Sequence, residues 1–277
     1  MDIVIVVVVG GGGGDVVIVV AVVAVFGGGV VIVVVIVIVV IVIVVIDFRL
    51  FQMMISSSSI LLKSIVRLTK SDISRTATLI HNAFPLEGTH SWARAVGMKQ
   101  SNLEYWLREE YLQKPISEDI GCYGISKGDE LLGVIINERF PLEEDKLDDI
   151  EEDEFLKDAY SSFDALLDAG KEIVRNKLKQ KGLPDKNIGY IAWIASQEQY
   201  RGQGIADELI SKSCSEMINN NYKHCIAFCV SPTATRVFSK RDFIEWGDIN
   251  YKNFQHKGKN PFAILPDSMT IMVKELK

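Results

Sequence analysis

The chain has 277 residues and a net charge of −6, from 30 Lys and Arg residues against 36 Asp and Glu residues. This mildly acidic balance lacks the basic surface that nucleic-acid binding requires, so we expect no nucleic-acid partner. Neither the four histidines nor the four cysteines follow the spacing of metal ligands, and we predict no metal site. Cys225 and Cys229 lie on one face of an apolar stretch, which favours reduced core cysteines in an intracellular protein.

Residues 3–46 form a low-complexity segment of Val and Ile runs, broken by glycines at 10–14 and 27–29. Three interpretations compete. In the first, residues 30–46 anchor the chain in a membrane, although these 17 apolar residues fall short of the roughly 20 that a spanning helix needs. The basic residues that follow would then place the rest of the chain in the cytosol; they are Arg49, Lys63, Arg67 and Lys70.

The second interpretation is that residues 1–59 translate a simple repeat from an incorrect start, because a series of single-base codon changes links Val, Ile, Gly, Ala and Asp. We favour this second interpretation. The third, a packed domain of strands, ranks last because a long Val/Ile run without turn residues or charges is prone to aggregate. We therefore divide the chain into a low-complexity segment at 1–59 and a folded domain at 60–277.

The folded domain alternates predicted strands and helices. Apolar patterns predict strands at residues 64–68, 121–125, 131–137, 188–195, 224–230, 243–251 and 269–275. Helical patterns cover residues 71–84, 101–113, 155–179, 205–220 and 233–240, with Ser71 and Ser101 as expected N-caps. This order predicts an α/β fold with a central mixed sheet and helices on both faces.

A glycine-bearing turn joins the strand at 188–195 to the following helix. Its residues are Gln199, Tyr200, Arg201, Gly202, Gln203, Gly204, Ile205 and Ala206. Such a turn points several backbone amides and the positive end of the helix dipole at one small volume, which suits an anion. The two glycines reach the backbone angles that this arrangement requires, and Arg201 adds a positive charge. The spacing fits neither a P-loop nor a dinucleotide fingerprint.

The turn fits the pattern Gln/Arg-x-x-Gly-x-Gly/Ala and resembles the acetyl-coenzyme A (acetyl-CoA) loop of the GNAT acetyltransferase superfamily. The order of predicted elements over residues 64–276 matches the fold of that superfamily. The resemblance implies that residues 199–206 bind acetyl-CoA as cosubstrate. Backbone amides of Ile194, Ala195 and Ser196, on the preceding strand, are expected to pair with pantetheine and to stabilise the oxyanion of the transition state.

Two stretches resemble arylalkylamine and dopamine N-acetyltransferases within this superfamily. Residues 83–88, Ala-Phe-Pro-Leu-Glu-Gly, resemble their Phe-x-x-Glu-Pro segment, with Gly88 in place of the usual Pro. Residues 250–275 resemble their carboxyl end. The resemblance makes Glu87 the candidate base that removes a proton from the amine through a water. This role requires a carboxyl pKa raised toward roughly 6 to 7.

The sequence lacks the residue that protonates the departing thiolate in many superfamily members. Those members place a Tyr before a Gly-Phe pair, whereas this chain has Phe238 and Asp242 in the Tyr and Gly positions. Ser231 is the candidate for a hydroxyl on the coenzyme side, and its alternative role is a helix cap beside Pro232. Three tryptophans are candidates either for lining an aromatic amine pocket or for plain core: Trp92, Trp106 and Trp193.

We therefore expect an acetyl-CoA-dependent N-acetyltransferase that acts on a small, arylalkylamine-like primary amine by direct transfer, without an acyl-enzyme. One alternative acetylates a protein amino terminus, a lysine or a polyamine. A second alternative is a non-catalytic GNAT module that binds acyl-CoA, which the replaced Tyr and Gly keep open. We expect a cytoplasmic protein, or one anchored to a membrane and facing the cytosol if residues 30–46 form an anchor. The sequence predicts neither the particular amine nor the oligomeric state.

Overall fold

The computed structural model describes residues 2–11, 16–26, 29–34, 63–84, 91–140 and 154–277. The chain falls into two units, at residues 1–60 and 61–277. The candidate base Glu87 lies outside the described residues, as does the stretch 35–46 of the possible membrane anchor. The second unit contains the other candidate site residues.

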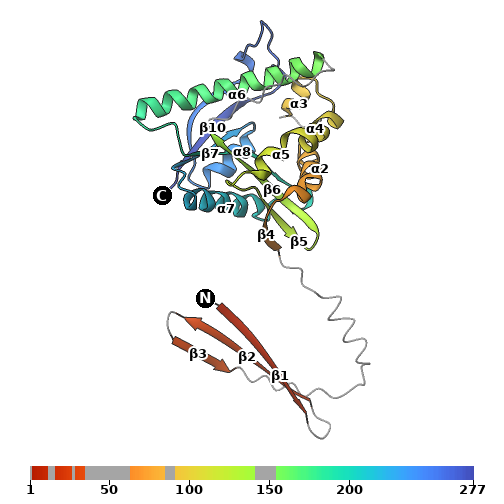
Figure 1. The fold of residues 1–277 in the computed structure, drawn as a ribbon, viewed down its shortest axis with the longest axis vertical. Coiled ribbons are helices and arrows are strands. Elements are labelled where there is room, and N and C mark those ends of the chain that lie inside the picture. The colour runs from red at the N-terminus through yellow and green to blue at the C-terminus, as the bar shows by residue number, and fades with distance from the viewer. Residues whose placement is uncertain (1, 12–15, 27–28, 35–62, 85–90, 141–153) are drawn as a thin grey trace. The chain divides into compact units, whose positions relative to one another are not determined.

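The first unit is an antiparallel sheet of three strands (Figure 1). The strands are β1 (Asp2–Gly11), β2 (Val16–Phe26) and β3 (Gly29–Val34). Their Val and Ile residues are β-branched and favour an extended backbone, which accounts for these strands. A domain of strands is the interpretation of this segment that the sequence ranks last. No helix in the described part of the chain is long and apolar enough to cross a membrane.

The second unit is built on a seven-stranded sheet in the order β4-β5-β6-β7-β8-β10-β9 (Figure 1). The strands are β4 (Lys63–Arg67), β5 (Tyr123–Lys127), β6 (Glu130–Phe140), β7 (Ile188–Ser196), β8 (His224–Cys229), β9 (Ile244–Asn250) and β10 (Ser268–Glu275). β7 and β8 pair in parallel, and the other neighbouring strands pair antiparallel. The predicted mixed sheet is confirmed.

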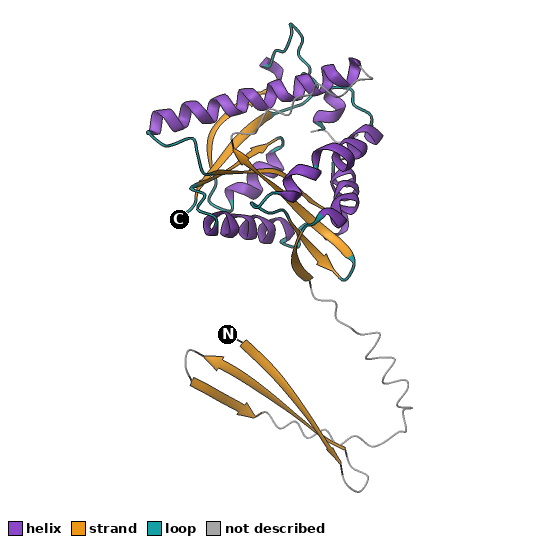
Figure 2. Ribbon diagram, viewed as in Figure 1, coloured by secondary structure: helices purple, strands orange, loops and turns teal. Residues whose placement is uncertain are grey.

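Helices cover both faces of this sheet, as predicted (Figure 2). The α-helices are α2 (Ile73–Ala83), α3 (Trp92–Ala95), α4 (Gln100–Trp106), α5 (Gln113–Ser117), α6 (Glu154–Lys181), α7 (Ile205–Asn219) and α8 (Pro232–Ser239). Shorter helical turns are η1 (Lys70–Asp72), η2 (Leu107–Tyr111), η4 (Glu198–Tyr200) and η5 (Tyr251–Asn253). β4 to β10 and these helices together form the α/β architecture that the pattern of the sequence predicts.

The core is divided by the sheet into two clusters of buried residues. One cluster packs α2, α4 and α6 against the sheet, with Ile80, Leu103 and Val174 as buried representatives. The other packs α7 and α8 against the opposite face, with Leu209 and Phe238 buried there. The four cysteines are buried and carry free thiols, in agreement with the predicted reduced core cysteines.

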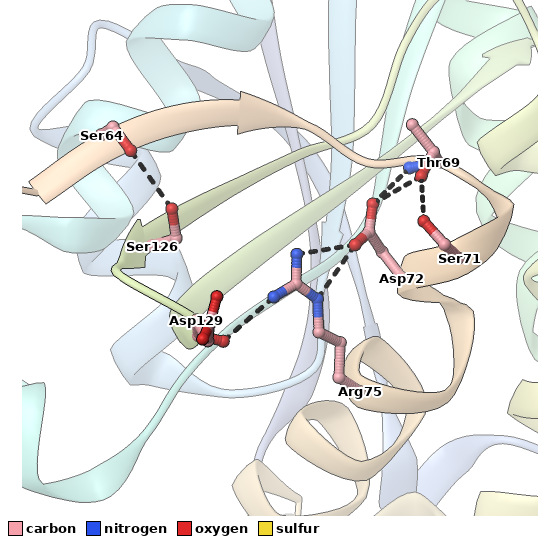
Figure 3. Close-up of polar contacts among 7 residues, drawn as sticks. All are labelled: Ser64, Thr69, Ser71, Asp72, Arg75, Ser126 and Asp129. Carbon is pink, nitrogen blue, oxygen red and sulfur yellow. Dashed lines mark hydrogen bonds and ion pairs between the residues drawn. The ribbon is translucent and has the colours of Figure 1, made fainter.

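Two predicted helix starts are wrong. Ser71 lies inside η1, and the chain turns into α2 through Asp72, whose carboxylate accepts from the Thr69 amide at 2.7 Å and from Arg75 at 2.6 Å (Figure 3). Burial raises the pKa of Asp72, but hydrogen bonds from Thr69 and Arg75 outweigh burial and hold this pKa below its ordinary value. Arg75 also donates to the Asp129 carbonyl at 3.1 Å, which ties the start of α2 to the β5–β6 turn.

The second error concerns the helix expected from Ser101 to residue 113. The structure starts α4 at Gln100, and a π-helical turn, η2, interrupts the helical path at Leu107 before α5 begins. The sequence also missed α3, whose N-cap Ser91 accepts from the Arg94 amide at 3.2 Å. A π-helical turn displaces the following side chains, and here it ends at Tyr111 beside the site described below.

Candidate active site

The two parallel strands at the centre of the sheet separate along their length. β7 pairs with β8 from Ile188↔His224 to Ile191↔Ala227, and among the described residues their pairing ends there although β7 continues to Ser196. On its other edge β7 pairs with β6, where the register shifts around Ala192. Such a bulge bends a strand, so residues 192–196 of β7 leave β8 and their backbone faces a gap, which we call the wedge.

A cavity of about 780 Å³ opens at the wedge. Ala192, Trp193 and Ile194 line it from β7, and residues 227–231 line it from β8 and the turn that follows. The predicted residues Ile194 and Ser231 thus come together in one cavity, although they are 37 positions apart in the sequence. Ala195 and Ser196 continue β7 toward the glycine-bearing turn.

The glycine-bearing turn follows the end of β7 and leads into α7. Gly202 and Gly204 have φ angles of +77° and +79°, in the left-handed region that favours glycine. A Cβ placed on Gly202 would meet no atom within 4 Å, so the backbone angle, rather than crowding, requires glycine there. α7 begins at Ile205, and its first-turn amides, including that of Ala206, have no intrahelical acceptor. This end of α7 therefore suits an anion.

Side-chain contacts hold the turn against the rest of the domain. Tyr200 donates from its hydroxyl to Glu130 at 3.0 Å, and Gln203 accepts from Lys63 at 3.2 Å. Gln199 donates to Gln197 at 2.6 Å. The exposed Arg201 reaches the Ala83 carbonyl at 3.5 Å, which leaves its guanidinium charge beside the turn. These contacts join the turn to β4, β6 and the end of α2.

Ser231 is the N-cap of α8, and its hydroxyl oxygen accepts from the Ala234 amide at 3.3 Å. The capping role considered from the sequence is therefore present. Because the same residue lines the cavity, and a capping hydroxyl keeps its hydrogen for donation, capping leaves Ser231 able to donate toward the wedge.

Phe238 and Asp242 occupy the positions where many relatives of the superfamily have Tyr and Gly. Phe238 is buried, packs edge-on against Phe243 with ring centroids 5.0 Å apart, and lines the cavity. Asp242 has a φ angle of +62°, so this turn keeps the left-handed backbone that glycine adopts readily. The exposed Asp242 side chain lies 3.4 Å from Lys274.

Aromatic rings line one side of the cavity; they come from Phe84, which follows α2, and from α3, α4, η2 and α6. Trp92 stacks on Phe163 with centroids 4.1 Å apart, and Trp193 lies edge-on to Phe84 at 5.4 Å. Trp106 stacks on Tyr111 at 4.8 Å. The three tryptophans singled out in the sequence all line this cavity, and Trp92 and Trp193 are buried as well.

The cavity lining includes a polar group to which the sequence did not point. The Tyr111 hydroxyl donates to Glu138 of β6, and Glu138 lies directly opposite Tyr190 of β7. All three residues line the cavity. Burial, together with the nearby charge of Glu138, raises the pKa of Tyr190 well above its ordinary value. The pairing of β6 with β7 and the position of η2 bring these residues together, so no local pattern could have revealed them.

Solved structures with the same fold include several enzymes. The C-terminal condensation domain of Ebony in complex with beta-alanyl-dopamine matches with a TM-score of 0.61 and 13% identity, over 78% of this chain and 99% of that chain. Arylalkylamine N-acetyltransferase 2 from Aedes aegypti matches with a TM-score of 0.57 and 18% identity, over 78% and 99%. The Drosophila melanogaster polyamine N-acetyltransferase that forms N-acetylagmatine matches with a TM-score of 0.57 and 11% identity, over 77% and 100%.

At these identities the structural likeness establishes the fold. No curated protein sequence matches the chain. The model of the acetyltransferase (GNAT) family matches residues 92–243, a span that includes the aromatic lining except Phe84, together with β6, the wedge and the glycine-bearing turn. That span exceeds half of the chain, and it shows that the chain belongs to the GNAT acetyltransferase family.

Proposed function

We propose that this N-acetyltransferase transfers the acetyl group of acetyl-CoA to a small primary amine by direct attack on the thioester. The observation that carries the proposal is that residues 192–196 of β7, which do not pair with β8, connect a cavity lined by aromatic rings to the glycine-bearing turn along the chain. An anion-binding turn, an unpaired strand edge and an apolar pocket suit the diphosphate, the pantetheine and the acceptor, respectively.

On the coenzyme side, residues 199–206 would bind the diphosphate through backbone amides and Arg201. Amides of Ile194, Ala195 and Ser196 would pair with pantetheine as an added strand does. One of them would donate to the carbonyl oxygen of the thioester, where negative charge develops during attack. Ser231 would donate toward the departing thiolate from the opposite side of the wedge.

The acceptor must lose a proton to react. An alkyl amine has a pKa near 10, so roughly one molecule in a thousand is neutral at pH 7. Glu87 is our proposed base on the strength of its position in the Phe-x-x-Glu motif. It would take this proton through a water.

We propose an arylalkylamine as the acceptor, because rings of Trp106, Tyr111 and Trp193 line the cavity and such faces and edges pack well against another aromatic ring. A second candidate is a non-catalytic module that binds acyl-CoA. The buried Phe238 favours it, since a benzyl group cannot donate a proton to the thiolate. A cytoplasmic location remains part of the proposal.

The test is release of the coenzyme A thiol by the full-length protein with acetyl-CoA, across phenethylamines, polyamines and peptides. Turnover with phenethylamines, at a kcat/KM at least tenfold above that with polyamines and peptides, is the expected result; tenfold corresponds to about 1.4 kcal/mol. Turnover with peptides or polyamines alone would contradict the acceptor assignment. Coenzyme A binding without turnover on any amine would select the non-catalytic module.

A further inference from the structure

The described residues that line the cavity carry an excess of negative charge. Five of them are acidic and three are basic. One of the basic residues, Lys171, is buried and forms an ion pair with Asp168 at 2.7 Å. Another, Arg139, pairs with Asp119, which is not part of the lining. Because acidic side chains outnumber basic ones, the cavity favours a cationic ligand over an anionic one.

Glu110, on η2, is an acidic lining residue that a ligand can reach. Its side chain lines the cavity and remains in contact with solvent. Among the described residues, no hydrogen bond or ion pair reaches its carboxylate, whereas the preceding Glu109 pairs with Arg108 at 2.7 Å. Desolvation by the surrounding protein raises the pKa of Glu110 above its ordinary value. A cation bound beside this carboxylate would offset the lost hydration.

A row of aromatic rings connects Glu110 to the wedge. Tyr111 lies edge-on to Trp193 with ring centroids 6.2 Å apart. Trp106 contacts both Tyr111, at 4.8 Å, and Tyr160, at 5.6 Å. Burial, followed by the charge of Glu110, raises the pKa of Tyr160, which places Glu110 near this last ring. The row therefore has Trp193 of the wedge at one end and Glu110 at the other.

This arrangement determines which part of an acceptor meets Glu110. With the reacting nitrogen at the wedge, an acceptor that lies along the row of rings has its remote end near Glu110. Trp and Tyr rings attract a cation that approaches their faces, and a carboxylate adds charge-assisted hydrogen bonds to an ammonium. The rings and the carboxylate at this end of the row therefore suit the same chemical group.

We propose that Glu110, together with the rings of Trp106 and Tyr160, binds a cationic group at the end of the acceptor remote from the reacting nitrogen. This inference rests on the proposed function and adds a specificity-determining residue to it. Among arylalkylamines, it favours those that carry a second ammonium. The aromatic body would pack along the row of rings while one nitrogen attacks the thioester and the other contacts Glu110.

The experiment compares two acceptors of the same shape on the full-length protein. They are 1,4-bis(2-aminoethyl)benzene and 4-propylphenethylamine, in which a methyl group replaces one ammonium. Amine affinity is measured by calorimetry with coenzyme A present, and kcat/KM is measured where turnover occurs. The two amines also differ in hydrophobicity, so the deciding quantity is how far the preference for the diamine changes between the wild type and each variant.

Two substitutions of Glu110 test the role of its charge. Glu110→Gln removes the charge and keeps the size of the side chain, and we expect it to lower the preference for the diamine by roughly fivefold to tenfold. Glu110→Asp keeps the charge on a shorter side chain and should retain part of the preference. Affinity for 4-propylphenethylamine should stay within about threefold of the wild-type value in both variants.

The neighbouring residue provides a matched control. Glu109→Gln makes the same change of charge one position earlier on η2, but Glu109 pairs with Arg108 and does not line the cavity. This variant should keep the wild-type preference for the diamine. Unchanged coenzyme A affinity in each variant establishes that the domain is folded.

An equal preference for the diamine in the wild type and in Glu110→Gln would overturn the inference. An equal loss of preference in Glu109→Gln and Glu110→Gln would also overturn it, because the effect would then come from the overall charge. Failure of the proposed function has a different signature. In that case no amine is acetylated, while the calorimetric comparison of amine binding by the wild type and Glu110→Gln still decides the role of Glu110.

Discussion

The proposed coenzyme side and the proposed acceptor side of this domain differ in how their residues are brought together. Eight consecutive residues, 199–206, form the glycine-bearing turn, and β7 leads directly into them. The proposed acceptor cavity instead collects rings and charges from the residue after α2 and from α3, α4, η2, α5, α6, β6 and β7. A coenzyme common to a whole family can be bound by one contiguous motif, whereas an acceptor that varies among members is bound by residues that only the fold assembles.

The largest effect is expected from Gly202→Ala, which tests whether the turn binds the coenzyme through its backbone. Gly202→Ala forces an alanine into a left-handed conformation, at a cost of about 1 to 2 kcal/mol, and relaxation of the turn moves its amides. We expect a coenzyme A dissociation constant raised roughly tenfold or more by calorimetry, since each 1.4 kcal/mol is tenfold.

Gly182→Ala is the matched control for this change. Gly182 also has a positive φ, +63°, and likewise has nothing within 4 Å of an added Cβ, but it follows α6 away from the turn. Both variants should lose similar stability in denaturant unfolding, and only Gly202→Ala should weaken coenzyme binding. Equal coenzyme affinity in the two variants would contradict the proposal that the turn binds the anionic part of the coenzyme.

A smaller effect is expected on the acceptor side. Trp106→Leu removes the ring that stacks on Tyr111 and keeps an apolar side chain in its place. Because aromatic pairs contribute about 0.5 to 1.5 kcal/mol, we expect KM for phenethylamine to rise roughly threefold to tenfold. The KM for butylamine and the affinity for coenzyme A should change little. A similar rise for both amines would show that Trp106 supports the fold of the cavity rather than contacting an aromatic acceptor.

The smallest effect concerns the turn that departs from the superfamily pattern. Asp242→Gly places glycine where the backbone is left-handed, and the ion pair that it removes is exposed and contributes little. We expect the free energy of unfolding to rise by about 0.5 to 1 kcal/mol, as measured by urea denaturation. A loss of stability would instead assign a structural role to the contact between Asp242 and Lys274.

The sequence predicted most of the fold because its patterns are local. The apolar strand at 188–195 and the helix after Gly204 lie within one or two residues of β7 and α7. The helix starts at Ser71 and Ser101 were wrong because tertiary contacts decided them: Asp72 bridges Thr69 to Arg75, and η2 interrupts the second helix. A serine in a helical pattern indicates a cap only where the preceding chain leaves the helical path.

The same contrast explains what the sequence revealed of the candidate site. The turn at 199–206 and Ser231 belong to short motifs, and the structure places Ser231 and Ile194 in one cavity. Tyr111 and Glu138 are 27 positions apart, and their hydrogen bond depends on the π-helical turn and on the register of β6 against β7. Strand register is a long-range property, so residue patterns within one element do not predict it.

The most direct test of direct acetyl transfer is a single turnover of the full-length protein with isotope-labelled acetyl-CoA and phenethylamine, with mass spectrometry of both the amine and the protein. Our account predicts labelled N-acetylphenethylamine, free coenzyme A and protein that carries no label. Labelled protein that forms and decays before the product would contradict direct attack and require an acyl-enzyme. Bound, intact acetyl-CoA with unmodified amine would contradict acetyl transfer to this amine altogether.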